Sequence, residues 1–142
     1  MKRMRLSVGI LGVALMLLLC SCGLFGPQRY VCEADKVESI QIIRLDEYVV
    51  GEYRYEYTVL CEIEDRTVFI ERLNRLKHRV NWGDPMQLHS GYIVIRVGYL
   101  NGDFDYVNPH AQWFNRSGRN NYGFFFFDEE QFNALISDYW TE

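Results

Sequence analysis

The clearest pattern in the chain is an alternation of apolar and mainly polar positions over residues 53–63. Tyrosine, valine, cysteine and isoleucine occupy every second position, and most positions between them are Glu, Arg or Thr. A period of two is typical of a strand with one buried face. The Ile-rich residues 37–45 predict a strand before it, and Gly51 lies in the turn that joins the two.

Two helices are predicted from apolar positions three or four residues apart. Asp65 is a suitable N-cap for the first, which we expect to run to about Arg79, where basic residues suit the negative end of the helix dipole. Asp128 and Gln131 form a capping-box-like start for the second. The apolar stripes are Phe69, Leu73 and Leu76 in the first helix and Phe132, Leu135, Ile136 and Tyr139 in the second.

Residues 90–100 predict a strand that ends at Asn101-Gly102, a pair typical of the two-residue type I′ hairpin turn. The resulting register pairs Val97 with Tyr106 and turns Asp105 outward to water. One face of this hairpin then holds the apolar side chains Ile93, Ile95, Val97, Phe104 and Tyr106.

A further hairpin is expected from residues 112–115 and 122–127, with residues 116–121 as a loose tip. Its second strand contains four consecutive phenylalanines at positions 124–127, which place two rings on each side. These rings belong to the core if the strand is covered on both sides, and they form an interaction patch if one side is open.

In chain order, these segments are two strands, a helix, four strands and a final helix. The order predicts an α+β fold, with a small antiparallel sheet of about five or six strands and two helices packed on one face. We expect residues 37–142 to form this single globular domain, which suits a length of 142 residues and a hydrophobic content of 49%.

The first 22 residues follow a different pattern. Three basic residues lie within the first five, and residues 6–19 carry no charge, which is typical of a secretory signal peptide. The run ends in Leu19-Cys20-Ser21-Cys22, which resembles the lipobox of bacterial lipoproteins. Cys20 does not fit the lipid-bearing position because the residue before it, Leu19, is not small.

This resemblance implies that residues 1–21 are removed and that Cys22 carries a diacylglycerol lipid with fatty acids such as palmitate. Residues 22–36, the lipidated cysteine included, are expected to form a flexible tether. An uncleaved N-terminal anchor is the alternative. Either arrangement predicts a domain held at a cell membrane on its extracytoplasmic side, at the outer surface or in the periplasm.

Removal of the signal changes the balance of charge. Lys2, Arg3 and Arg5 are lost, so 15 basic against 19 acidic residues become 12 against 19, a formal charge near −7. Such a balance disfavours nucleic acid and direct adhesion to anionic headgroups. We therefore expect the membrane to be bound through the lipid on Cys22.

No pattern in the sequence indicates a catalytic centre, a metal site or a cofactor. The serines lie in none of the usual nucleophile motifs, and His78, His89 and His110 are expected far apart. Cys32 and Cys61 remain after processing in a compartment where disulfides persist. Either a disulfide between them or two free thiols would fit the sequence.

The candidate binding residues are Arg116 and Arg119, which lie in the loose tip of the last hairpin, and Trp113 and Tyr122, which flank it. Trp, Tyr and Arg dominate binding hot spots because they combine a large area with directional donors. The alternative is a solvated turn with Trp113 buried beneath it.

A second candidate is the tyrosine stripe of residues 53, 55 and 57. We expect these rings in the core; open to water, they would bind a sugar, a peptide or a protein. The chain is thus predicted to be a membrane-anchored lipoprotein with a non-enzymatic binding or interaction domain, whose partner is an envelope protein or a wall polymer. The alternatives are a small cell-envelope hydrolase and an inhibitor or immunity-type protein.

Overall fold

The structure, a computed structural model, describes residues 30–52, 54–80, 87–116, 119–122 and 125–141, with residues 119–122 described by their backbone alone. The predicted signal sequence, Cys22, Tyr53 and Phe124 lie outside these ranges, so the predictions that concern them stay predictions. No helix within the described ranges is long and apolar enough to cross a membrane.

The described chain forms two sheets and two α-helices. In chain order the elements are η1 (Ala34–Lys36), β1 (Val37–Val49), β2 (Arg54–Glu62), α2 (Arg66–Arg75), β3 (His78–Val80), β4 (Ile93–Tyr99), β5 (Phe104–Val107), β6 (Gln112–Arg116), β7 (Arg119–Tyr122), β8 (Phe125–Phe127) and α3 (Glu129–Ser137). The larger sheet is antiparallel and six-stranded, in the order β2-β1-β4-β5-β6-β7, and β3 pairs with β8 in a separate antiparallel sheet. The predicted α+β fold is confirmed.

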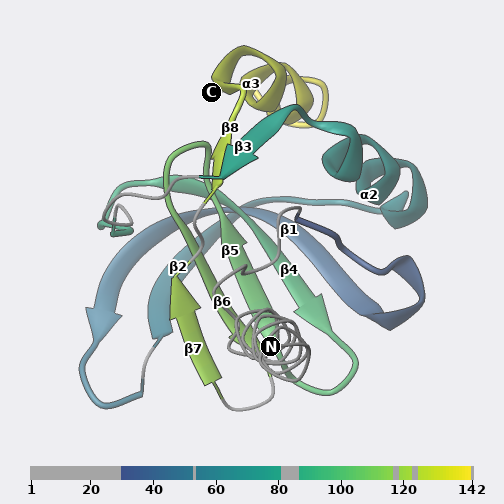
Figure 1. Ribbon diagram of the computed structural model, residues 1–142. Coiled ribbons are helices and arrows are strands. Elements are labelled where there is room, and N and C mark those ends of the chain that lie inside the picture. The colour runs from purple at the N-terminus through teal and green to yellow at the C-terminus, as the bar shows by residue number, and fades with distance from the viewer. Residues whose placement is uncertain (1–29, 53, 81–86, 117–118, 123–124, 142) are drawn as a thin grey trace, which may run out of the picture.

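Both helices cover the same face of the larger sheet, as predicted, and the short β3–β8 sheet lies next to them (Figure 1). This first core is formed by apolar side chains from every layer. It includes Ile42, Ile95 and Val97 of the sheet, Phe69 and Leu73 of α2, Phe132 and Leu135 of α3, and Phe125 and Phe127 of β8. Phe125 and Phe127 are thus core residues on one side of β8, and Phe126 is half-buried.

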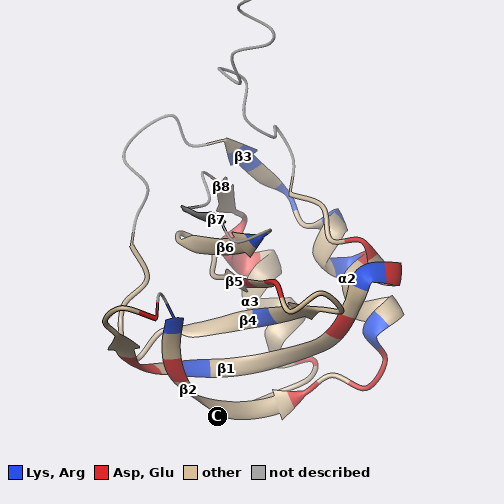
Figure 2. Ribbon diagram, turned by 90° about the horizontal axis from the view of Figure 1, so that it is seen from below, with Lys and Arg blue, Asp and Glu red and all other residues tan. Residues whose placement is uncertain are grey.

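The opposite face of the larger sheet is also buried, because the sheet curls on itself (Figure 2). Tyr55 of β2 and Trp113 of β6 are four strands apart, which would be about 19 Å in a flat sheet. Their ring centroids are only 5.9 Å apart. Tyr48, near the end of β1, lies 5.8 Å from the same Trp113 ring. The curled sheet therefore has a second aromatic core inside its concave face.

The predicted register of the β4–β5 hairpin is wrong by one residue. Val97 pairs with Asp105, and Tyr106 pairs with Arg96. The connection is a three-residue loop rather than a type I′ turn: the Tyr99 N–H donates to the Asp103 carbonyl at 2.9 Å, and Gly102 has a φ of 85°. A loop with a left-handed glycine at its third position shifts the pairing. Tyr106 therefore faces the second core, and Asp105 lies on the helix side.

Helix α2 begins as predicted and ends early. The side chain of Asp65 accepts a hydrogen bond from the Val68 N–H at 3.2 Å, which confirms the N-cap. The helix ends at Arg75, because the next residues turn into β3 and pair with β8. The basic run around His78, expected at a helix end, lies on a strand instead.

The last predicted hairpin is divided into two parts. Strand β6 continues to Arg116 and β7 starts at Arg119, so most of the expected loose tip is paired backbone. Strand β8 does not continue β7 in the larger sheet but pairs with β3. Asp128 caps α3 as predicted, accepting from the Gln131 N–H at 3.0 Å.

The tyrosine stripe of β2 faces the second core only in part. Tyr55 is buried there and Tyr57 packs against it, as expected of core residues. A register shift opposite Ile42 and Ile43 then moves Cys61 to the first core. The alternation seen in the sequence therefore serves two faces, one on each side of this bulge.

Candidate functional site

The structure separates the residues predicted to form one binding site. Trp113 and Arg116 are three positions apart on β6, so their side chains lie on opposite faces of the sheet. Trp113 is 4% exposed and packs in the second core against Tyr48 and Tyr55. The alternative of a buried Trp113 is therefore correct. The backbones of Arg119 and Tyr122 pair with Arg116 and Trp113, and their side chains lie outside the described part of the chain.

Arg116 holds a buried carboxylate on the helix side of the sheet. Asp105 is 0% exposed, and its Oδ1 accepts from Arg116 Nε at 2.9 Å while Arg116 Nη2 contacts Oδ2. The hydroxyls of Tyr30 and Tyr99 also donate to Oδ2, at 3.1 Å and 2.7 Å. We call these four residues, Tyr30, Tyr99, Asp105 and Arg116, the Asp105 clasp.

The clasp satisfies a group that would otherwise be very unfavourable inside the protein. A buried carboxylate without partners costs several kcal/mol, and Asp105 has four hydrogen-bond contacts from three side chains. Burial, and next the charge of Asp105, raise the pKa of both tyrosines well above the usual value, so their hydroxyls remain donors. The bond to Asp105 raises the pKa of Arg116. The guanidinium carbon also lies 5.1 Å from the centroid of the Tyr99 ring.

The clasp fixes the segment that precedes β1. Tyr30 is 3% exposed, and its ring stacks on Phe114 at 5.6 Å and meets Phe127 edge-on at 5.8 Å. Its backbone N–H donates to Nε2 of His78 at 3.2 Å. The predicted flexible tether is therefore wrong for residues 30–36, because aromatic packing and the clasp hold their beginning in the core.

Asn74 of α2 adds a second attachment for the same segment. Its Oδ1 accepts from the Cys32 N–H and its Nδ2 donates to the Cys32 carbonyl, both at 2.8 Å. The Asn74 amide thus supplies the donor and the acceptor that a neighbouring strand would otherwise provide for the Cys32 backbone. The fold consequently already includes Tyr30, ahead of the predicted boundary at residue 37.

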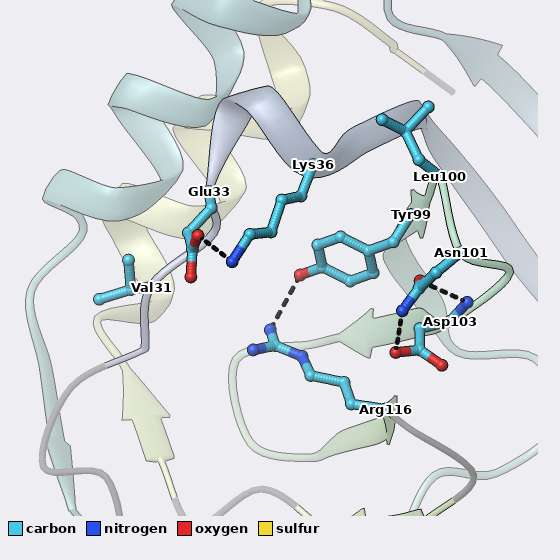
Figure 3. Close-up of a pocket in the computed structure, with 8 residues that line it drawn as sticks. All are labelled: Val31, Glu33, Lys36, Tyr99, Leu100, Asn101, Asp103 and Arg116. Carbon is cyan, nitrogen blue, oxygen red and sulfur yellow. Dashed lines mark hydrogen bonds and ion pairs between the residues drawn. The ribbon is translucent and has the colours of Figure 1, made fainter.

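A surface hollow of about 320 Å³ lies beside the clasp, between η1 and the β4–β5 loop (Figure 3). Its lining consists of Val31, Glu33, Lys36, Tyr99, Leu100, Asn101, Asp103 and Arg116. Lys36 lies 2.5 Å from Glu33, and Asn101 donates to Asp103 at 2.8 Å. Each charged group in this lining therefore has a partner, since Arg116 binds Asp105. The bond that joins η1 to the hairpin is between backbone groups: the Leu100 N–H donates to the Lys36 carbonyl at 3.0 Å.

The two described cysteines are free thiols, so the disulfide between Cys32 and Cys61 is not formed. Cys32 is buried beside Tyr99, and burial raises its pKa to about 11. Cys61 is half-buried on β2, where its Sγ lies 3.5 Å from the carbonyl of Tyr139.

The histidines serve separate contacts. His78 binds Tyr30, whereas His110 lies 3.3 Å from Glu129 at one side of a shallow groove of about 560 Å³ along α3. This groove is partly lined by Phe132, Ile136 and Trp140. Within the described ranges, no group of three or more His, Cys, Asp or Glu side chains is placed to hold a metal ion.

Sequence patterns missed three members of the clasp, Tyr30, Tyr99 and Asp105. Asp105 was expected in water because the turn was taken as two residues long, and Tyr30 was expected in a tether. The available signal was Gly102, which also suits a three-residue loop and would have placed Asp105 on the helix side.

Comparison with protein-family models, with curated proteins and with solved structures gave no match.

Proposed function

We propose that this chain is a lipoprotein of a bacterial cell envelope, anchored by a lipid on Cys22, whose domain binds a partner on the extracytoplasmic side. The observation that carries the proposal is the lipobox-like run Leu19-Cys20-Ser21-Cys22 behind a basic and then apolar leader. Because Tyr30 already belongs to the fold, at most residues 23–29 separate it from a lipid on Cys22.

A binding role is supported by how the described charged groups are used. At the hollow of Figure 3, Lys36 is bound to Glu33. Arg116, which also lines the hollow, is bound to the buried Asp105. These pairs leave the groups poorly placed for proton transfer to a substrate, which a hydrolase would require. An envelope protein or a wall polymer is the partner that we propose.

Metabolic labelling with an alkyne fatty acid tests the anchor. We expect wild-type protein and the Cys20→Ala variant to incorporate the label and to sediment with membranes. The Cys22→Ala variant should incorporate none and should be found unprocessed or released. Since the two cysteines are neighbours in the same leader, equal labelling of both variants would refute the proposal.

A further inference from the structure

The place where the chain joins the domain lies next to the β3–β8 sheet. Tyr30 binds His78 of β3 through its backbone and packs against Phe125 and Phe127 of β8. These contacts are on the inner side of the short sheet. An anchor on residue 22 is therefore attached to the domain at the end that carries the β3–β8 sheet.

The chain between a lipid on Cys22 and Tyr30 is short compared with the domain. Eight Cα–Cα steps separate the two residues, and they span at most about 28 Å when fully extended. A domain of this size has a radius of gyration of about 13 Å, and hence a diameter of roughly 34 Å. The far side of the domain consequently cannot easily turn to the membrane.

Positive charge without acidic partners is found at the same end. Lys77 and Arg79 flank His78, both are exposed, and neither forms an ion pair with a described carboxylate. Asp128, whose N–H donates to the Lys77 carbonyl, uses its own carboxylate to cap α3. In Figure 2, blue marks β3 whereas red and blue alternate along β1 and β2.

Four other exposed cations are paired with acids: Lys36, Arg44, Arg54 and Arg75 each have a carboxylate oxygen within 3.6 Å. Arg66, which is also exposed, donates instead to the backbone carbonyls of Val37 and Glu38. Among the described residues, Lys77 and Arg79 are thus two exposed cations, close together in the sequence, that bind no carboxylate. Arg79 also lies over the ring of the half-buried Phe126, 5.3 Å from its centroid, on the outer side of the short sheet. A cation with an aromatic ring suits the headgroup region of a bilayer.

We propose that the outer side of the β3–β8 sheet, formed by Lys77, Arg79 and Phe126, rests on anionic phospholipid headgroups and gives the anchored domain one fixed orientation. The inference rests on the proposed lipid at Cys22 for the short connection. The negative charge of the whole domain repels the same surface, so the other sides turn away.

Photo-crosslinking on vesicles tests the orientation. The mature chain from residue 22 is joined at its N-terminus to a synthetic diacyl lipid, so the result does not depend on lipidation in the cell. A benzophenone amino acid replaces Val31, which is 48% exposed next to Tyr30, or Val50, which is 87% exposed in the β1–β2 turn. On phosphatidylglycerol vesicles, we expect position 31 to crosslink to lipid at least about fivefold more than position 50. A factor of about five corresponds to the attraction of a single Lys or Arg to an anionic membrane surface.

The role of charge is tested by variants with the same change in net charge. Lys77→Glu with Arg79→Glu should lower the yield at position 31 about fivefold or more, and Arg44→Glu with Arg54→Glu should not. Replacing phosphatidylglycerol by phosphatidylcholine should lower the yield at position 31 by a similar factor in the protein that keeps Lys77 and Arg79. This comparison needs no charge variant, so it decides whether charge matters if the first variant misfolds. Equal crosslinking at positions 31 and 50, or a yield at position 31 that is indifferent to both tests of charge, would overturn the proposal. Failure of fatty-acid labelling at Cys22 would instead overturn the proposed function.

Discussion

At the scale of single residues, Asp105 determines more of the structure than any predicted binding residue. Its carboxylate is fully buried, and the residues that bind it come from three places in the chain: residue 30, the end of β4 and the end of β6. The contact with Tyr30 spans 75 positions. No local pattern can reveal a pair so distant, which is why the clasp escaped prediction while Arg116 alone was noticed.

Loss of Arg116 should therefore destabilise the fold rather than remove a free binding group. Arg116→Ala leaves a buried carboxylate without its cation, a change that costs about 3–5 kcal/mol for a fully buried pair. The cost is expected to be smaller here, because the Arg116 side chain is 42% exposed and both tyrosine hydroxyls still donate to Asp105. Urea unfolding followed by tryptophan fluorescence measures it. The control, Arg54→Ala, removes an exposed pair with Glu52 and should leave the midpoint nearly unchanged. Similar midpoints for the two variants would show that the clasp contributes little.

The two thiols should differ in reactivity. Because burial raises the pKa of Cys32 to about 11, almost no thiolate is present there near neutral pH. We expect iodoacetamide at pH 8 to modify the half-buried Cys61 first and Cys32 only after denaturation. Peptide mass spectrometry over time separates the two sites. Equal rates in the native protein would contradict the burial of Cys32.

At the scale of elements, the sequence predicts caps and apolar stripes well and strand pairing poorly. Asp65 and Asp128 cap the helices as expected, because a cap depends on neighbours three residues away. The end of α2 and the register of β4–β5 depend on partners elsewhere. The residues of β3 resemble a helix end until β8 supplies the pairing, and the pair Asn101-Gly102 suits loops of either length.

The three-residue loop makes a specific demand at Gly102, whose φ of 85° lies in the left-handed region. Gly102→Ala should destabilise the protein by about 1–2 kcal/mol, since an ordinary side chain is strained there. Gly102→Asn should lose clearly less, because asparagine tolerates this region. Thermal unfolding of the two variants compares them, and a Gly102→Ala variant as stable as wild type would contradict this loop geometry.

At the scale of the whole molecule, two cores share one curled sheet. The first core contains one thiol and two tyrosine hydroxyls whose pKa values are raised. These are Cys32, Tyr30 and Tyr99. Above about pH 9 the unfolded chain releases protons from such groups while the folded chain retains them. Rising pH then favours unfolding. Stability contributed by these groups is thus complete below about pH 9 and declines as the pH rises toward 11 and beyond.

The decline should appear as a fall in the midpoint of thermal unfolding between pH 8 and pH 11. Tyr30→Phe keeps the stacked ring and removes one of the groups, so its midpoint should fall less steeply with pH than that of wild type. Measuring the difference between the two proteins cancels the titration of lysines, which they share. Parallel curves would show that Tyr30 does not contribute.

The contact between the first and last described segments also bears on when the chain can finish folding if it is exported as proposed above. In that case Tyr30 would leave the translocation channel early, yet its ring packs against Phe125 and Phe127, which follow about 95 positions later. Contacts of such high sequence separation form slowly. Until the C-terminal part has emerged, the first core lacks β8 and α3, and proteases can still cut the open chain. Only a polypeptide synthesised through β8 can bury its own beginning, so truncated products remain recognisable as incomplete.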